Sequence, residues 1–155
     1  VDDDYDHEAW LETVKGLEDE PEMGGRCLKC FKYRLLRTAE YAASRGIKVI
    51  TSTLASSRWK SLDQINEAGE WACAALAARL GVESDPDDSQ RSVCPCGAVD
   101  VNRLGVEDFP VMVPPVWWNH NWKKGGLQER RLQIIKEYGF YNQLYCGCEF
   151  SMRKD

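Results

Sequence analysis

Six of the seven cysteines of this chain lie in three closely spaced pairs. The pairs are Cys27-x-x-Cys30, Cys94-x-Cys96 and Cys146-x-Cys148. An odd number of cysteines cannot all form disulfides, and these spacings are too short for ordinary structural disulfides. A metal accepts closely spaced thiolates, so the cysteines favour a metal site. They also favour a reducing compartment, which we expect to be the cytoplasm.

Cys27 and Cys30 are one helical turn apart, at or just before the expected start of a helix. We expect the helix dipole and the neighbouring Arg26 and Lys29 to lower the pKa of both thiols. By itself the pair fits a zinc or iron–sulfur half-site, a redox dithiol, or two unrelated thiols.

The pair Cys146-Gly147-Cys148 is less common, because the glycine lets the backbone bend so that both sulfurs can face one centre. Two such pairs supply four thiolates, enough for a tetrahedral zinc or an iron–sulfur cluster. The alternative is a flexible tail with incidental cysteines. The flanking Tyr145 and Phe150 argue against that alternative, since aromatic residues usually pack.

The other cysteines have different expected roles. Cys94-Pro95-Cys96-Gly97 would bind a separate metal or close its own loop. Cys73 lies between alanines in a helical pattern and is expected to be a small core residue. His7, in an acidic segment, is expected to be a surface residue.

The elements that position these residues alternate between helix and strand. Helical spacing of apolar residues covers 7–16, 28–45, 61–80 and 127–138, and strand-like segments cover 47–54 and 111–119. Ser61 and Gln64 form a capping box at the start of the third helix. The order implies parallel α/β crossovers with a three-layer form. We expect one domain over residues 1–155, with an insertion at 83–113.

Sites in parallel sheets lie at the C-terminal ends of strands, where loops 51–60 and 119–126 fall. The helix start after loop 119–126 is a natural place for an anion. His120 is interpreted as a proton donor or a plain hydrogen-bonding group. The tryptophans around it would stack a nucleobase or belong to the core.

Charge and hydropathy exclude some functions. The formal net charge is −5, so charge alone does not suggest a nucleic-acid binder. Locally basic stretches still allow phosphate binding, and Arg58 and Lys60 are either phosphate ligands or solvated side chains. No run of apolar residues is long enough to span a membrane, and no membrane partner is expected.

Three stretches together resemble the cobalamin-independent epoxyqueuosine reductases, the QueH family. They are "RCLKCFKYRLLRTAEYA" (26–42), "ITSTLASSRWKSLDQINEAGE" (50–70) and "NWKKGGLQERRLQIIKEYGFYNQLYCGCEFS" (121–151). The resemblance covers about two thirds of the chain, in the family's order. It implies a Rossmann-like fold of the nucleotide α-hydrolase (HUP-like) type and an iron–sulfur oxidoreductase. Such enzymes convert epoxyqueuosine to queuosine at the wobble position of tRNA.

The resemblance also implies roles for individual residues. Cys27, Cys30, Cys146 and Cys148 match family cysteines at the metal centre, which we expect to hold a 4Fe-4S cluster with an adjacent iron. Thr51, Thr53, Lys60, Lys123, Gly125, Gly126 and Tyr145 fall on recurring family positions. We predict catalytic roles for His120, Tyr145 and Lys60. We predict substrate binding by Thr51, Thr53, Arg58, Trp122, Lys123, Lys124, Gly125 and Gly126.

The family pattern also contains an N-terminal strand and a "His-x-Cys-Cys-Ala-Pro" turn that do not occur in this chain. We expect a missing segment, a partner chain, or Cys94 and Cys96 to complete the metal site. "SSRWK" (56–60) replaces the family's usual Ser-Pro-x-Lys.

The expected partners are the tRNA anticodon loop, where an unstacked base is easily reached, and an unidentified electron donor. The alternative function is a non-catalytic zinc-binding or interaction module that uses the same cysteines.

Overall fold

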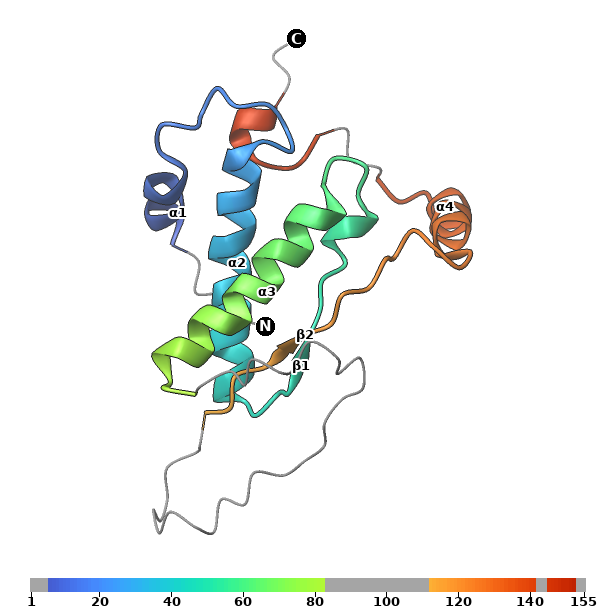
Figure 1. Cartoon of the computed structure of the whole chain (residues 1–155). Helices are drawn as coiled ribbons and strands as arrows, with labels where there is room; N and C mark the ends of the chain where they lie inside the picture. Colours follow the sequence, from blue (N-terminus) through green and yellow to red (C-terminus); the bar gives the residue numbers. More distant parts are fainter. Residues whose placement is uncertain (1–5, 83–111, 142–144, 153–155) are drawn as a thin grey trace.

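A computed structural model of the chain describes residues 6–82, 112–141 and 145–152. The element order is α1 (His7–Val14), α2 (Gly25–Ser44), β1 (Val49–Ile50), the 3₁₀ helix η1 (Leu54–Ser56), α3 (Leu62–Arg79), β2 (Val116–Trp117), α4 (Leu127–Tyr138) and the 3₁₀ helix η4 (Glu149–Ser151) (Figure 1). Nearly all of the expected insertion, with Cys94 and Cys96, lies outside the described residues.

The predicted helices are confirmed within a few residues, and the chain is α/β with a small parallel sheet. Ser61 caps α3, accepting a hydrogen bond from the Gln64 amide at 3.4 Å. The two strands are much shorter than predicted. β1 pairs with β2 in parallel, Val49 opposite Val116 and Ile50 opposite Trp117. The prolines directly before β2 have no N–H group, so they cannot extend the hydrogen-bonded ladder between the strands. After β1 the chain leaves the sheet and enters η1.

The core lies where α3 packs across α2, which is the most extensive contact between the described elements (Figure 1). On α2 the buried residues recur at helical spacing: Phe31, Leu35, Ala39 and Ala42. On α3 they are Ile65, Ala68, Ala72 and Leu76. Alanine on both faces lets the two backbones approach closely. This packing makes α2 a rigid support for the cysteines in its first turns.

The side chain of Trp117 fixes β2 against α3 at Gly69. A Cβ atom on Gly69 would lie 2.2 Å from the nearest atom of the Trp117 ring. The Trp117 indole also donates a hydrogen bond to Asn66 Oδ1 at 3.2 Å. Only glycine therefore fits beneath this ring in its present position.

Gly69→Ala should lower the free energy of unfolding by about 1–3 kcal/mol, because the added methyl overpacks the contact with Trp117. Urea unfolding of the two proteins measures the difference. In a Trp117→Ala background the same substitution should be neutral or stabilising, since alanine is the better helix former. An equal loss in both backgrounds would contradict the proposed packing.

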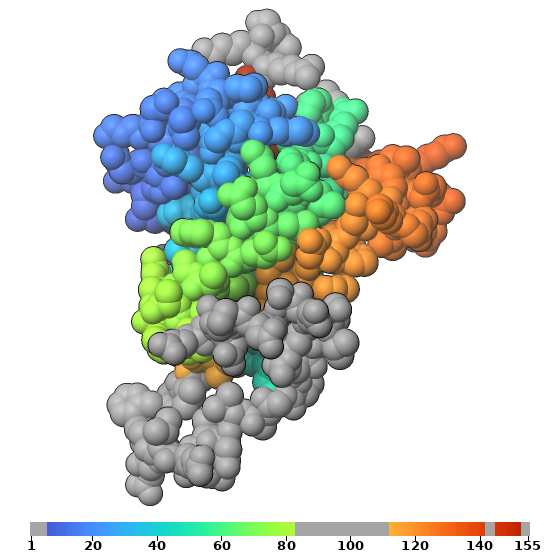
Figure 2. Space-filling view, viewed as in Figure 1, coloured from blue at the N-terminus to red at the C-terminus, as the bar shows by residue number. Residues whose placement is uncertain are grey.

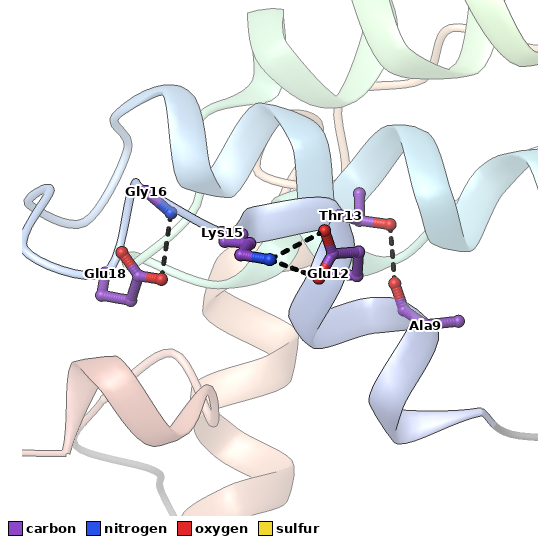
Figure 3. Close-up of polar contacts among 6 residues, drawn as sticks. All are labelled: Ala9, Glu12, Thr13, Lys15, Gly16 and Glu18. Atoms are coloured by element: carbon purple, nitrogen blue, oxygen red, sulfur yellow. Dashed lines mark hydrogen bonds and ion pairs between the residues drawn. The ribbon is translucent and has the colours of Figure 1, made fainter.

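The turn after α1 is held by local hydrogen bonds (Figure 3). Thr13 donates its hydroxyl hydrogen to the Ala9 carbonyl at 2.8 Å, Lys15 forms an ion pair with Glu12 at 3.0 Å, and the Gly16 amide donates to Glu18 Oε1 at 3.0 Å. The exposed ion pair contributes little stability. The turn matters for the site described below, because its carbonyl groups lie close to the start of α2.

Helix α4 stands apart from the core, and Figure 2 shows it projecting from the body of the molecule. None of its residues is buried. It follows Gly125 and Gly126, whose φ values of 66° and 79° lie in the left-handed region that favours glycine. No helix within the described ranges is long and apolar enough to cross a membrane.

Candidate functional site

The four predicted metal ligands line one cavity of about 970 Å³. Cys27 and Cys30 come from the first two turns of α2, and Cys146 and Cys148 come from the segment before η4. Figure 1 shows this segment passing the N-terminal end of α2. The fold therefore brings together thiols that are far apart in the sequence.

The start of α2 determines where the first two thiols lie. The helix begins at Gly25, so both cysteines lie inside it, one turn apart on the same side. The Met23 amide donates to Cys27 Sγ at 3.3 Å. The Gln64 side-chain amide donates to the Met23 carbonyl at 2.8 Å and to the Gly24 carbonyl at 3.2 Å. These bonds tie the cysteine pair to α3.

The segment that carries Cys146 and Cys148 is anchored at several points. The Cys146 amide donates to Glu22 Oε1 at 2.9 Å, and Lys60 Nζ donates to the Cys146 carbonyl at 3.3 Å. The Ser151 hydroxyl donates to the Cys148 carbonyl at 2.7 Å. Gly147 has a φ of 94°, which supports its predicted role in bending the backbone between the two cysteines. The segment is therefore a packed element and not a loose tail.

Arg26 connects this segment to the rest of the site. Its side chain is buried, at 2% exposure, and its guanidinium donates to the carbonyls of Leu17 and Glu18. It also lies over the Phe150 ring, 5.5 Å from the centroid, and Phe150 stacks on Trp10 at 5.9 Å. This arrangement holds a positive charge beside the thiols.

Burial raises the pKa of both the Cys27 and the Cys148 thiols above their ordinary value. For Cys27 burial outweighs the hydrogen bond from Met23 and the nearby charge of Arg26, both of which lower the pKa. The predicted fall in the Cys27 pKa is therefore wrong, because the thiol lies deeper than a helix start usually places it. Cys146 contributes to both upward shifts, which agrees with a shared cavity.

Cys73 does not line this cavity; it packs against the core from α3. Burial raises the pKa of its thiol to about 11. The thiol is therefore neutral in the folded protein at neutral pH. Because the pKa is higher in the folded than in the unfolded chain, folding gains stability from this group below the unfolded pKa. That gain is lost as the pH rises towards 11.

Alkylation of Cys73 in the folded protein should accelerate about tenfold per pH unit between pH 8 and 10, because the thiolate is the reactive form. Mass spectrometry of iodoacetamide-treated protein measures the rate. The same peptide in urea should show a half-maximal rate near pH 9 and level off about one pH unit higher. A half-maximal rate near pH 9 in the folded protein would contradict the raised pKa.

No group of three or more His, Cys, Asp or Glu side chains in residues 6–82, 112–141 and 145–152 is placed to hold a metal ion. A single tetrahedral zinc with Zn–S bonds of about 2.3 Å needs sulfurs roughly 4 Å apart. The described thiols thus surround one cavity without forming a ready three-ligand site for a single ion. Metal binding by these cysteines stays a prediction.

The other predicted site residues fall into two groups. Lys60 lies next to Cys146, as described above, and Tyr145 is half-buried directly before that cysteine. Arg58, Lys60 and Lys123 line a second cavity of about 330 Å³. The second group lies in the loops around the strand ends.

Within this group, Thr51 donates to the Trp118 carbonyl at 2.9 Å, and the Trp122 indole donates to the Ser52 carbonyl at 2.8 Å. His120 lies against the Trp118 and Trp122 rings, with centroids 4.8 and 4.5 Å away. His120 is not among the described residues that line either cavity. The exposed members are Thr53, Lys124, Gly125 and Gly126.

Several residues at the cysteine cavity had no signal in the sequence. Trp10 and His7, from α1, line the cavity, and His7 Nε2 lies 3.6 Å from Glu149 Oε1. His7 is exposed, as predicted, but it lies at the site. Glu22 comes from a loop without a recognisable motif. These residues reach the site only through long-range packing, which no local pattern reveals.

Comparison with known proteins identifies the family of this chain. The family model described as "Epoxyqueuosine reductase QueH" matches residues 1–85 and 100–154. Relatives named epoxyqueuosine reductase QueH include those of Histophilus somni (37% identity, 99% of this chain, 48% of the relative), Acinetobacter baylyi (36%, 99% and 54%) and Haemophilus influenzae (35%, 99% and 48%). The chain thus spans about half the length of these curated relatives. By these matches, the chain belongs to the epoxyqueuosine reductase QueH family.

Proposed function

We propose that this protein is an iron–sulfur tRNA-modifying reductase that converts epoxyqueuosine to queuosine at the wobble position. The observation that carries the proposal is the placement of Cys27, Cys30, Cys146 and Cys148 around one cavity, in a chain of the QueH family. Four thiol donors from two separate segments are typical of a cluster site.

The residues present fit a cluster in three respects. The cavity of about 970 Å³ has room for several iron and sulfide ions and an adjacent iron. The buried cation of Arg26 would offset the negative charge that thiolate ligands bring to a cluster. Arg26 Nε is buried without a hydrogen-bond partner among the described residues, so it is a spare donor beside the cavity.

Removal of an epoxide oxygen consumes two electrons and two protons, leaves a carbon–carbon double bond and releases water. A bound cluster would deliver the electrons, from an external low-potential donor, and the adjacent iron would act as a Lewis acid for the epoxide oxygen. Lys60, Tyr145 and His120 are the proposed proton donors. Of these, Lys60 donates to the Cys146 carbonyl, and Tyr145 directly precedes Cys146 in the chain.

The loops at the strand ends would receive the unstacked base. The rings of Trp118, His120 and Trp122 lie together after β2, and such faces stack nucleobases. We also propose that β1 and β2 are two strands of a larger parallel sheet in a Rossmann-like, three-layer fold. These loops then lie at the strand ends of that sheet. We further propose that the enzyme acts in the reducing cytoplasm, with a further segment or a partner chain completing the metal site.

Anaerobic purification of the protein tests the function. We expect a brown protein with iron and sulfide that converts epoxyqueuosine in tRNA when dithionite supplies electrons. A preparation that holds one zinc per chain, has no visible absorption and leaves epoxyqueuosine unchanged would support the zinc-binding alternative and end the reductase proposal.

A further inference from the structure

The second cavity is strongly basic although the whole chain is acidic. Its described lining includes four cations and no carboxylate: Arg58, Lys60, Lys123 and Arg131. The formal net charge of the chain is −5, so this concentration of positive charge is local. Like charges gathered around one cavity repel each other, and an anion in the cavity relieves that repulsion.

Three separate segments build this cavity. Arg58 and Lys60 come from the loop after η1, Lys123 from the turn before α4, and Arg131 from the second turn of α4. Ser56 and Ser57 add hydroxyl groups. The cavity also lies at the N-terminal end of α4, a 12-residue helix whose first amides favour an anion. Charge, hydroxyl groups and helix dipole therefore favour the same kind of ligand.

A second observation concerns Gln128, which also lines the cavity. Its Oε1 atom is buried and has no hydrogen-bond partner among the described residues. Buried acceptors are nearly always paired in native structures, so we expect the Gln128 side chain to turn towards the cavity when a ligand offers a donor there. A backbone phosphodiester carries no hydrogen and does not supply that donor, whereas the hydroxyl group of the neighbouring ribose does.

The rim of the cavity is partly apolar. Leu132 and Tyr141 line it, and the Tyr141 side chain is 78% exposed. An exposed aromatic ring beside a basic cavity is a common platform for a base of single-stranded RNA. Lys60 lines this cavity and also donates to the Cys146 carbonyl, so the basic cavity adjoins the cysteine site.

From these features we propose that the second cavity binds a backbone phosphate of the RNA substrate, with Gln128 accepting from the neighbouring ribose hydroxyl. The proposal rests on the proposed function for the identity of the RNA. It needs no metal, because the binding groups are the cations, hydroxyls and amides of the cavity. The cavity would set the position of one nucleotide while another reaches the cysteines.

Binding of an unmodified anticodon stem-loop RNA to the intact protein, followed by fluorescence anisotropy, tests this proposal. The Lys123→Gln/Arg131→Gln variant should bind at least tenfold more weakly at low salt. Its slope of log Kobs against log salt should be smaller by about 0.7, which corresponds to one lost contact with a single-stranded phosphate. The matched control, Arg130→Gln/Lys136→Gln, removes the same charge from α4 outside the cavity and should change Kd less than twofold. Equal losses in both variants would overturn the proposal.

Two further experiments identify the ligand. A DNA of the same sequence should bind more weakly than the RNA to the unaltered protein, and Gln128→Leu should abolish most of that difference. If Gln128→Leu leaves the preference for RNA unchanged, the role of Gln128 is refuted. Inorganic phosphate that displaces the RNA only at millimolar concentration supports the RNA site, and displacement at micromolar concentration indicates a small-anion site instead. A protein that holds zinc in place of iron, leaves epoxyqueuosine unchanged and still passes these tests would refute the reductase and leave this inference intact.

Discussion

Replacement of Cys146 by alanine should reduce the iron bound by the anaerobically purified protein at least tenfold. Cys146 lines the cavity together with Cys27, Cys30 and Cys148, and its backbone is fixed by Glu22 and Lys60. A fixed backbone cannot bring a substitute ligand into the same place, so the lost thiolate is not replaced. Iron and sulfide measured per folded chain give the result.

The matched control is Cys73→Ala, since Cys73 lies on α3 away from the cavity. Its iron and sulfide content should equal that of the unaltered protein. Circular dichroism should show that both variants are folded. Equal iron loss in both variants, or full iron retention in Cys146→Ala, would contradict the assignment of the ligands.

Arg26→Met should lower the free energy of unfolding by about 3 kcal/mol and also weaken the cysteine site. The substitution leaves the carbonyls of Leu17 and Glu18 without their charged donor and removes the cation from the Phe150 ring. Because Arg26 lowers the pKa of both Cys27 and Cys148, its loss should raise those pKa values further. Urea unfolding and the pH dependence of thiol alkylation measure the two effects.

Two variants separate these effects. Arg26→Lys keeps the charge but not the forked donor, so it should lose stability while preserving most of the shift on the thiols. Arg45→Met removes an exposed arginine that lies over Tyr41, and it should change the free energy of unfolding by less than about 0.5 kcal/mol. The interpretation fails if Arg26→Met is as mild as Arg45→Met.

The parts of the fold that depend on local pattern could be predicted from the sequence. Helical spacing of Phe31, Leu35 and Ala39 on α2 predicted the face that packs on α3. The capping box at Ser61 predicted the start of α3, because its geometry involves only the four consecutive residues 61–64. The two cysteine pairs at one cavity were expected because a shared metal explains both spacings.

The parts that depend on distant contacts could not be predicted. The length of β1 is set by its pairing with β2, where the preceding prolines limit the ladder, and this partner leaves no trace in the β1 segment itself. The burial of Arg26 depends on carbonyls from the turn after α1 and on a ring near the end of the described chain. Burial of the Cys27 thiol itself also depends on this packing, and it raises the pKa of Cys27, so a prediction from the neighbouring charges alone had the wrong sign.

The division of the cysteine cavity between α2 and the segment before η4 also sets an order of events during translation. Cys27 and Cys30 leave the ribosome first, and more than a hundred residues follow before Cys146 and Cys148 emerge. At about 5–20 residues per second, the first pair waits on the order of ten seconds for the second. During that interval the nascent chain carries two unprotected thiols, so assembly of the centre must wait until the second pair has been synthesised.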